Sequence, residues 1–179
     1  DQSISIAAND VDILGTVSSG TGSTTIAVSD GGTIGLGDTL GNMSISGAEL
    51  ANITAGILNI GNSSTGNITV DNISAANSNN ANTINLTTAG DSSVSFSNSN
   101  STFNSLTANG GTTSFGSGLT IATATGKFSI DSTSITSAGA LTLAGATGID
   151  FGAGVTFTAG GDLTMSTTSG DIEGAGAFT

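Results

Sequence analysis

The sequence predicts an all-β protein, a parallel β-helix (β-solenoid) of about eight coils, each of about 22 residues with three short strands. Three observations predict this fold: short runs that alternate apolar and polar residues, a regular internal repeat, and a composition of small side chains. The 179 residues include 28 Gly and no Pro, and the seven Phe are the only aromatic residues. A thin rod with a narrow core can bury its apolar side chains without many aromatic ones.

Strands are predicted wherever alternate residues are apolar, because one face of such a strand is buried. The clearest runs are Ser3–Ile6, Thr25–Val28, Asn67–Val70, Thr83–Leu86 and Ser93–Phe96. Gly, Asn, Asp or Ser clusters follow the runs and favour turns. These residue types are also weak helix formers, so no helical segment is expected.

The repeat is clearest in the last third of the chain. Leu119, Leu141 and Leu163 follow one another at equal intervals, and we expect them to stack in one inward ladder. A second series leads from Phe128 through Ile149 to Ile172 in two steps of nearly the same length. Stacked coils explain both series, because equivalent residues of successive coils lie on top of one another.

Other alignments extend the repeat along the chain. Ile4–Ile6 is aligned with Ile26–Val28 one repeat further on, and Phe115 is aligned with Ile135 and Phe157 in the same way. The spacing loosens between residues 59 and 111. The whole chain, 1–179, is expected to form one solenoid domain with an irregular polar insertion around residues 75–82. That insertion is interpreted as a bulged corner or a surface loop or, alternatively, as a binding loop that projects from the rod.

Three segments carry a resemblance to a known family. The segments Thr158–Met165, Ser137–Leu143 and Thr168–Ile172 resemble the repeats of filamentous-haemagglutinin-type exoproteins and autotransporter-type passengers of bacteria. That resemblance implies a β-helical shaft of an exported surface adhesin or fibre. The export domain of the family carries Asn-Pro motifs, which this chain lacks, so the resemblance concerns the repetitive shaft alone.

Composition excludes several classes of function. Without Cys or His, the chain cannot build a Cys/His zinc site or a His-dependent nucleophile system. A net charge of −12 with a single cation, Lys127, disfavours nucleic acid as a partner. No apolar stretch is long enough for a membrane helix, so membrane insertion is not expected. We therefore expect a non-enzymatic protein without a cofactor.

Carboxylates offer the one alternative with catalytic chemistry. Asp10 and Asp12 share a strand face if extended. Four more acidic residues fall in the last two coils, namely Asp150, Asp162, Asp171 and Glu173. Paired carboxylates hydrolyse glycosidic bonds, so a polysaccharide-active β-helix is a lower-ranked alternative. The competing interpretation is that these residues occupy turns and keep the rod soluble.

Three further patterns also have ordinary structural interpretations. The segment Gly35–Asn42 resembles half of a Gly-rich calcium-binding nonapeptide, although a turn is favoured over a calcium site. The outward threonines Thr120, Thr123 and Thr142 make ice binding a further hypothesis. However, the rows in which they lie also contain Ser, Asp and Gly. Seven Asn-X-Ser/Thr sequons occur, close to the about five expected by chance. They begin at Asn42, Asn52, Asn62, Asn67, Asn72, Asn85 and Asn100.

The leading functional hypothesis is an extracellular, cell-surface β-solenoid shaft of an adhesin or fibre, with a host-cell or glycan surface as a possible partner class. The alternative is a filament subunit that stacks end to end. Neither end has a recognisable cap, and an uncapped strand edge attracts another strand. We therefore expect Ile4 and Ile6 at one end, and Ile172 and Phe178 at the other, to lie at a junction with a second copy or with more of a parent chain.

Overall fold

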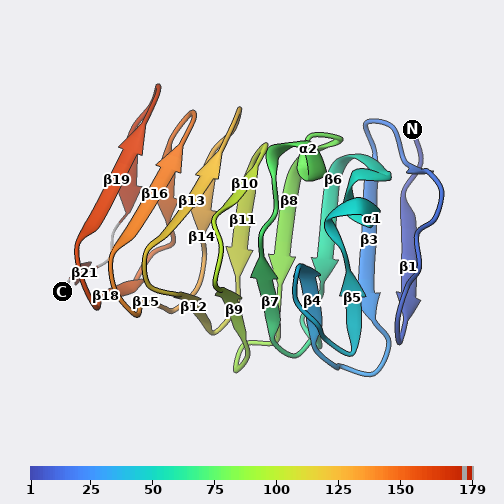
Figure 1. The fold of residues 1–179 in the computed structure, drawn as a ribbon, viewed down its shortest axis with the longest axis horizontal. Helices are drawn as coiled ribbons and strands as arrows, with labels where there is room; N and C mark the ends of the chain where they lie inside the picture. Colours follow the sequence, from blue (N-terminus) through green and yellow to red (C-terminus); the bar gives the residue numbers. More distant parts are fainter. Residues whose placement is uncertain (175–176, 179) are drawn as a thin grey trace.

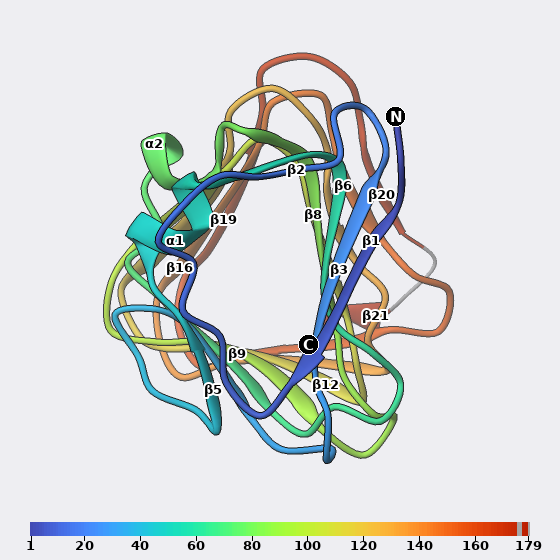
Figure 2. The same cartoon turned by 90° about the vertical axis from the view of Figure 1, so that its right-hand side faces the viewer.

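The computed structural model describes residues 1–174 and the backbone of residues 177–178. It confirms the predicted fold class: parallel strands stack into a β-solenoid of about 8 turns. In Figure 1 the coils follow one another along the long axis, with the N- and C-termini at opposite ends. Seen along the rod, the coils superpose into a closed outline (Figure 2).

Three parallel sheets form the sides of the rod. Sheet I contains β1 (Ile4–Ala8), β3 (Ser23–Val28), β6 (Ile53–Gly61), β8 (Ala81–Thr87), β11 (Leu106–Asn109), β14 (Phe128–Ile130), β17 (Ile149–Phe151) and β20 (Ile172–Gly174), with β2 (Val17–Ser18) also paired to β6. Sheet II contains β5 (Met43–Ile45), β4 (Ile34–Gly37), β7 (Ile68–Asp71), β9 (Ser93–Phe96), β12 (Thr112–Phe115), β15 (Ser134–Ser137), β18 (Thr156–Ala159) and β21 (Ala177–Phe178). Sheet III contains β10 (Ser101–Phe103), β13 (Leu119–Thr123), β16 (Leu141–Gly145) and β19 (Leu163–Thr167).

Alternation of apolar and polar residues decides which side chains fill the rod. Inward residues such as Ile121, Leu143 and Ile149 are completely buried, while their neighbours along each strand face solvent. The rings of Phe96 and Phe115, on adjacent coils, stack with centroids 5.1 Å apart. Such like-on-like stacking gives one continuous apolar core along the solenoid.

The repeat seen in the sequence is the observed register in the C-terminal half. Leu119 pairs with Leu141, and Leu141 pairs with Leu163, in successive strands of sheet III. Ile135 pairs with Phe157 in sheet II. The three leucines therefore form one inward ladder, with Leu119 and Leu141 buried and Leu163 half-buried at the end coil.

Two of the alignments expected from the sequence are wrong by two positions. Ile26 pairs with Ile6 and not with Ile4, so the first coil is slightly shorter than the repeat. Ile135 pairs with Thr113 and not with Phe115. A shift of two positions leaves every side chain on the same face of a strand, so alternation alone could not reveal either error.

The expectation of no helix is also wrong. Two short helices, α1 (Gly47–Ala51) and α2 (Ala75–Ser78), stand at a corner of the rod in adjacent coils (Figure 2). Each begins with a capping box in which a Ser side chain and the residue three positions later bond to each other's backbone N–H groups. These boxes satisfy N–H groups that a short helix would otherwise leave unpaired.

The predicted polar insertion at residues 75–82 contains helix α2 at a corner of the rod. Its first four residues form α2, and its seventh, Ala81, is buried at the start of β8. Ser78 is buried as well, and its hydroxyl donates to the carbonyl oxygen of Thr102 in the next coil, at 3.0 Å. Ser78 and Ala81 therefore anchor the segment to the stack, while five of its eight residues are exposed.

Extra residues in the second coil come from a reversal of the chain. After β4 the chain turns back over Gly35 and then forms β5, which pairs with β4 on the side away from β7. Consequently Ile34 of β4 pairs with Ile68 of β7. The two residues are separated in the sequence by well over the length of one repeat. Gly37 lies at the turn with φ +88°, and a Cβ there would collide with the carbonyl oxygen of Asp71.

Candidate functional site

The N-terminal end of the rod leaves apolar side chains partly uncovered. Among the described residues, β1 pairs with β3 alone, so its other edge has no strand partner. Ile4 and Ile6 are half-buried, whereas Ile26, the register partner of Ile6, is fully buried one coil further in. Both sequence-predicted residues therefore lie at this end with their inward faces incompletely covered.

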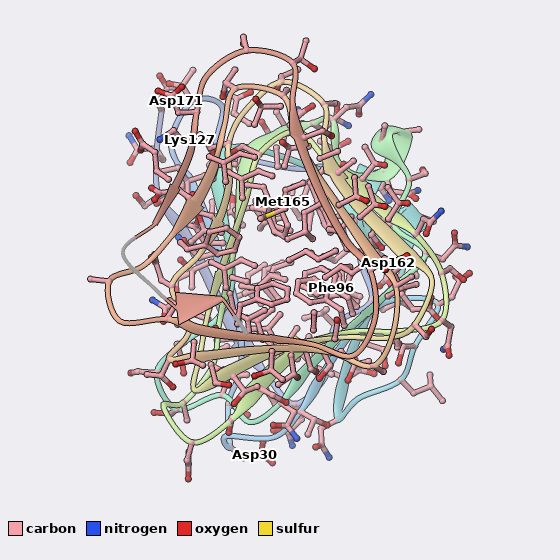
Figure 3. The ribbon with its side chains drawn as sticks, turned by 90° about the vertical axis from the view of Figure 1, so that its left-hand side faces the viewer. Asp30, Phe96, Lys127, Asp162, Met165 and Asp171 are labelled. Carbon is pink, nitrogen blue, oxygen red and sulfur yellow. The ribbon has the colours of Figure 1, made fainter. Side chains whose placement is uncertain are left out.

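The C-terminal end has the same character. Ile172 is 44% exposed, although Ile149, which precedes it in the ladder, is fully buried. Leu163 and Met165 are half-buried on β19. Figure 3, which looks onto this end, shows Met165 pointing into the coil, as Phe96 does deeper in the rod. The backbone of Phe178 pairs with Phe157, but its side chain lies outside the described part of the chain.

Acidic residues of the last coils do not form one site. Asp162 lies on the opposite side of the coil from Asp171 and Lys127 (Figure 3). On sheet I, the outward side chains of Asp150 and Glu173 are register neighbours, and the Lys127 ammonium lies 4.0 and 3.6 Å from their carboxylates. One cation thus offsets the repulsion between two carboxylates, a structural role for the only Lys.

Asp10 has a structural partner. A carboxylate oxygen of Asp10 accepts a hydrogen bond from the Ser44 N–H at 2.9 Å, tying the first coil to β5. Asp12 is exposed. These observations give Asp10 the role of a connector between neighbouring segments.

A shallow groove of about 140 Å³ follows the outer face of sheet III. Its lining includes Asp162 and the threonines Thr120, Thr142 and Thr164, which are register partners on three successive strands. Thr123, the third threonine of the ice-binding hypothesis, does not belong to this row. It is buried, and its hydroxyl donates to the Gly126 carbonyl at 2.7 Å. The groove is smaller than typical ligand pockets of about 300–1,000 Å³.

Residues Gly35–Asn42 form the reversal between β4 and β5. Here a carboxylate oxygen of Asp38 accepts a hydrogen bond from Asn72, and the Asn42 side-chain oxygen accepts one from the Thr33 N–H at 2.9 Å. Within the described residues, no group of three or more acidic side chains could hold a metal ion. The hydrogen bonds of Asp38 and Asn42 hold the segment in a turn between the two strands.

Sequence reasoning missed the most connected carboxylate, Glu49. One oxygen accepts from the Ile13 N–H at 3.0 Å, and the other accepts from the N–H and hydroxyl of Ser46 at 2.9 and 2.8 Å. Burial raises the pKa of Glu49, but these hydrogen bonds outweigh it, so the pKa lies below its usual value. The Ser46-X-X-Glu49 capping box was the signal that could have revealed it.

The described part of the chain contains no helix with the length and hydropathy needed to cross a membrane. Comparison of the chain with protein-family models, with curated proteins and with solved structures found no match.

Proposed function

We propose that this chain is a non-enzymatic structural and interaction protein, a β-solenoid shaft of an extracellular surface adhesin or fibre. The observation that carries the proposal is that the apolar core reaches both ends of the rod without being closed. Ile4 and Ile6 at one end, and Leu163, Met165 and Ile172 at the other, are more exposed than their equivalents inside. Further coils stacked on the ends would complete their burial.

The strand edges support the same proposal. Inner coils pair their axial N–H and C=O groups with the coils above and below, which satisfies the backbone. The free edge of β1 bears no Pro and no Lys, which are common devices against edge pairing. An additional coil would find a compatible strand edge at this end. Localisation at a cell surface rests on the resemblance to exported repeats and on the absence of cysteine.

End-to-end association of identical copies is the second candidate. In sheet I, β20 presents inward Ile172 at its first position, and β1 presents inward Ile4 at its first position. Stacking β20 on β1 would therefore place Ile on Ile. Acidic side chains at both ends oppose this contact: Asp1, Asp10 and Asp12 at one end, and Asp171 and Glu173 at the other. We therefore expect association to increase with ionic strength.

Paired edge variants test both forms of the proposal. Ile6→Lys places a charge in the open end, whereas Ser5→Lys, on the same strand, points outward and is the matched control. Light scattering at low and high ionic strength measures association of the purified chain. In a longer parent chain or a self-associated fibre, Ile6→Lys should shorten or break the rods seen by electron microscopy, and Ser5→Lys should not. Full-length rods with Ile6→Lys, or compact particles from the parent chain, would refute the proposal that this chain is part of a shaft.

A further inference from the structure

Asn109 is the only asparagine of the chain that is followed by glycine. It is the last residue of β11, at the corner where the chain leaves sheet I for β12 of sheet II (Figure 1). An asparagine amide can be lost without an enzyme when the backbone nitrogen of the next residue attacks the side-chain carbonyl carbon. Glycine allows this attack most readily, because it has no side chain to shield its nitrogen.

Close packing at this corner requires glycine at position 110. A Cβ at Gly110 would collide with the hydroxyl oxygen of Thr88, and Thr88 is itself buried. A Cβ at Gly111 would collide with the carbonyl oxygen of Gly90 in the preceding coil. Because the corner has no space for a side chain, an unshielded backbone nitrogen follows Asn109.

The Gly110 N–H makes no hydrogen bond within the part of the chain that the structure describes. Pairing of β11 with β14 on the next coil ends at Ala108, whose partner is Ile130. The following N–H, of Gly111, donates to the Ser92 carbonyl at 2.9 Å. No hydrogen bond of the Gly110 nitrogen therefore has to open before that nitrogen can act as a nucleophile.

The Asn109 side chain is also unconstrained. It is exposed, and its amide makes no hydrogen bond to any residue that the structure describes. The contact that opposes the reaction is in the backbone, where the Asn109 carbonyl accepts a hydrogen bond from the Thr88 N–H at 3.0 Å. Closing a ring onto Gly110 requires rotation about the Cα–C bond of Asn109, so this hydrogen bond at the end of the strand must open.

Asn104 lies in the same coil and has the opposite properties. It is followed by Ser105, and its Nδ2 donates to the carbonyls of Asn79 and Ala81 at 3.0 and 3.1 Å. Its own carbonyl accepts a hydrogen bond from the Gly126 N–H at 2.8 Å. Asn104 is therefore held at both its side chain and its backbone, and it serves as an internal reference for Asn109.

We propose that Asn109 is a site of spontaneous deamidation in the folded solenoid, with the Gly110 nitrogen as nucleophile and water as the second reactant. The Gly110 nitrogen forms a bond to the Asn109 Cγ, and the bond from Cγ to Nδ2 breaks. The proton of the Gly110 nitrogen passes through solvent to Nδ2, which leaves as ammonia, and a succinimide ring remains. Water then adds to one of the two ring carbonyl carbons. The bond from that carbon to the Gly110 nitrogen breaks, and the nitrogen regains a proton.

The two directions of ring opening give different backbones. Cleavage at Cγ gives aspartate with the main chain unchanged. Cleavage at the main-chain carbonyl carbon gives isoaspartate, in which the chain continues through Cβ and Cγ and is longer by one carbon. Either product makes the net charge of −12 more negative. Isoaspartate also lengthens the chain where Gly110 and Gly111 pack closely against the preceding coil, so it should lower the stability of the solenoid.

The test compares the folded chain with unfolded peptides that span Asn109 and Asn104. Both are incubated in mildly alkaline buffer at physiological temperature, and mass spectrometry after proteolysis follows the gain of one mass unit at each asparagine. Dividing each peptide rate by the rate in the folded chain gives the protection that folding provides. We expect about tenfold protection at Asn109, where one hydrogen bond must open, and about a hundredfold or more at Asn104, where several must open.

Asn109→Gln is the matched control variant. Glutamine would have to close a larger ring, and the exposed side chain has no contact to lose, so the variant should keep the wild-type unfolding midpoint and show no change of mass at this position. The proposal goes beyond the shaft function, because deamidation of the isolated chain is measured whether or not the rod continues through its ends. Equal protection at Asn109 and Asn104 would indicate reaction from the globally unfolded chain and would overturn the proposal. An unchanged Asn109 in the folded chain after complete conversion of its peptide would also overturn it.

Discussion

The Thr113 hydroxyl lies 2.6 Å from the Ser132 hydroxyl inside the apolar core of the solenoid, and both side chains are almost completely buried. Thr113 occupies a position in sheet II between Val94 and Ile135, where the ladder otherwise consists of apolar residues. Each hydroxyl satisfies the other, so the polar pair is tolerated where water is excluded.

Thr113→Val should destabilise the protein by about 1–3 kcal/mol, because it leaves the Ser132 hydroxyl buried without its partner. The double variant Thr113→Val/Ser132→Ala removes both hydroxyls and should recover part of that loss. Urea unfolding of the wild type, both single variants and the double variant gives the coupling energy. Strictly additive effects would show that the hydroxyl pair contributes nothing.

The leucine ladder makes a second prediction. Leu141→Asp places an unpaired charge between Leu119 and Leu163 and should cost about 3 kcal/mol or more. Ala144→Asp, on the same strand but facing outward, is the control and should change stability by less than about 1 kcal/mol. Thermal unfolding followed by circular dichroism compares the two. Similar losses for both variants would contradict an inward ladder.

Glu49 gives stability a defined pH dependence. Its folded-state pKa lies below the unfolded value of about 4.3, so its contribution is complete above that value and is lost as the pH falls towards the folded-state pKa. Glu49→Gln cannot accept hydrogen bonds with both side-chain atoms and should lower stability at neutral pH. The difference from wild type should shrink below about pH 4. Urea titrations at a series of pH values measure it, and a difference independent of pH would refute the role of the charge.

Lys127→Met should expose the repulsion between Asp150 and Glu173. The groups are about half exposed, so the expected loss is less than about 1 kcal/mol and should diminish at high ionic strength. Chemical unfolding at two salt concentrations checks this. A loss that persists unchanged at high salt would point to packing of the Lys stem instead of charge.

Gly37→Ala should be among the most damaging single-methyl changes. The residue has φ +88°, and the added Cβ would meet the Asp71 carbonyl oxygen, a backbone atom of the next coil. Gly90→Ala, where a Cβ meets no atom within 4 Å, is the matched control. Comparison of their unfolding midpoints tests the prediction, and equal midpoints would contradict the observed turn.

The sequence predicted the architecture because alternation and regular spacing report directly on stacked strands. It did not predict register where polar residues point inward: apolar matching favours Phe115 as the partner of Ile135, whereas Thr113 occupies that position. Helix α1 was not predicted because it is short and begins with Gly47, a weak helix former. Its Ser46–Glu49 capping box was nevertheless present in the sequence. The contact between the Asn52 side chain and the Ile13 carbonyl joins residues distant in the sequence, and no local pattern reveals it.

The reversal at β4 and β5 also has a mechanical consequence. Pulled from its C-terminus, a solenoid should lose one coil at a time, and each coil of about 22 residues should release roughly 70 Å of chain. The N-terminal coils are connected to one another by contacts between segments that are not consecutive in the repeat. Strand β5 pairs with β4, the Asp10 carboxylate accepts a hydrogen bond from the Ser44 N–H, and β2 pairs with β6. Peeling should therefore stop at this point, and the last segment should resist to a higher force before releasing in one larger step.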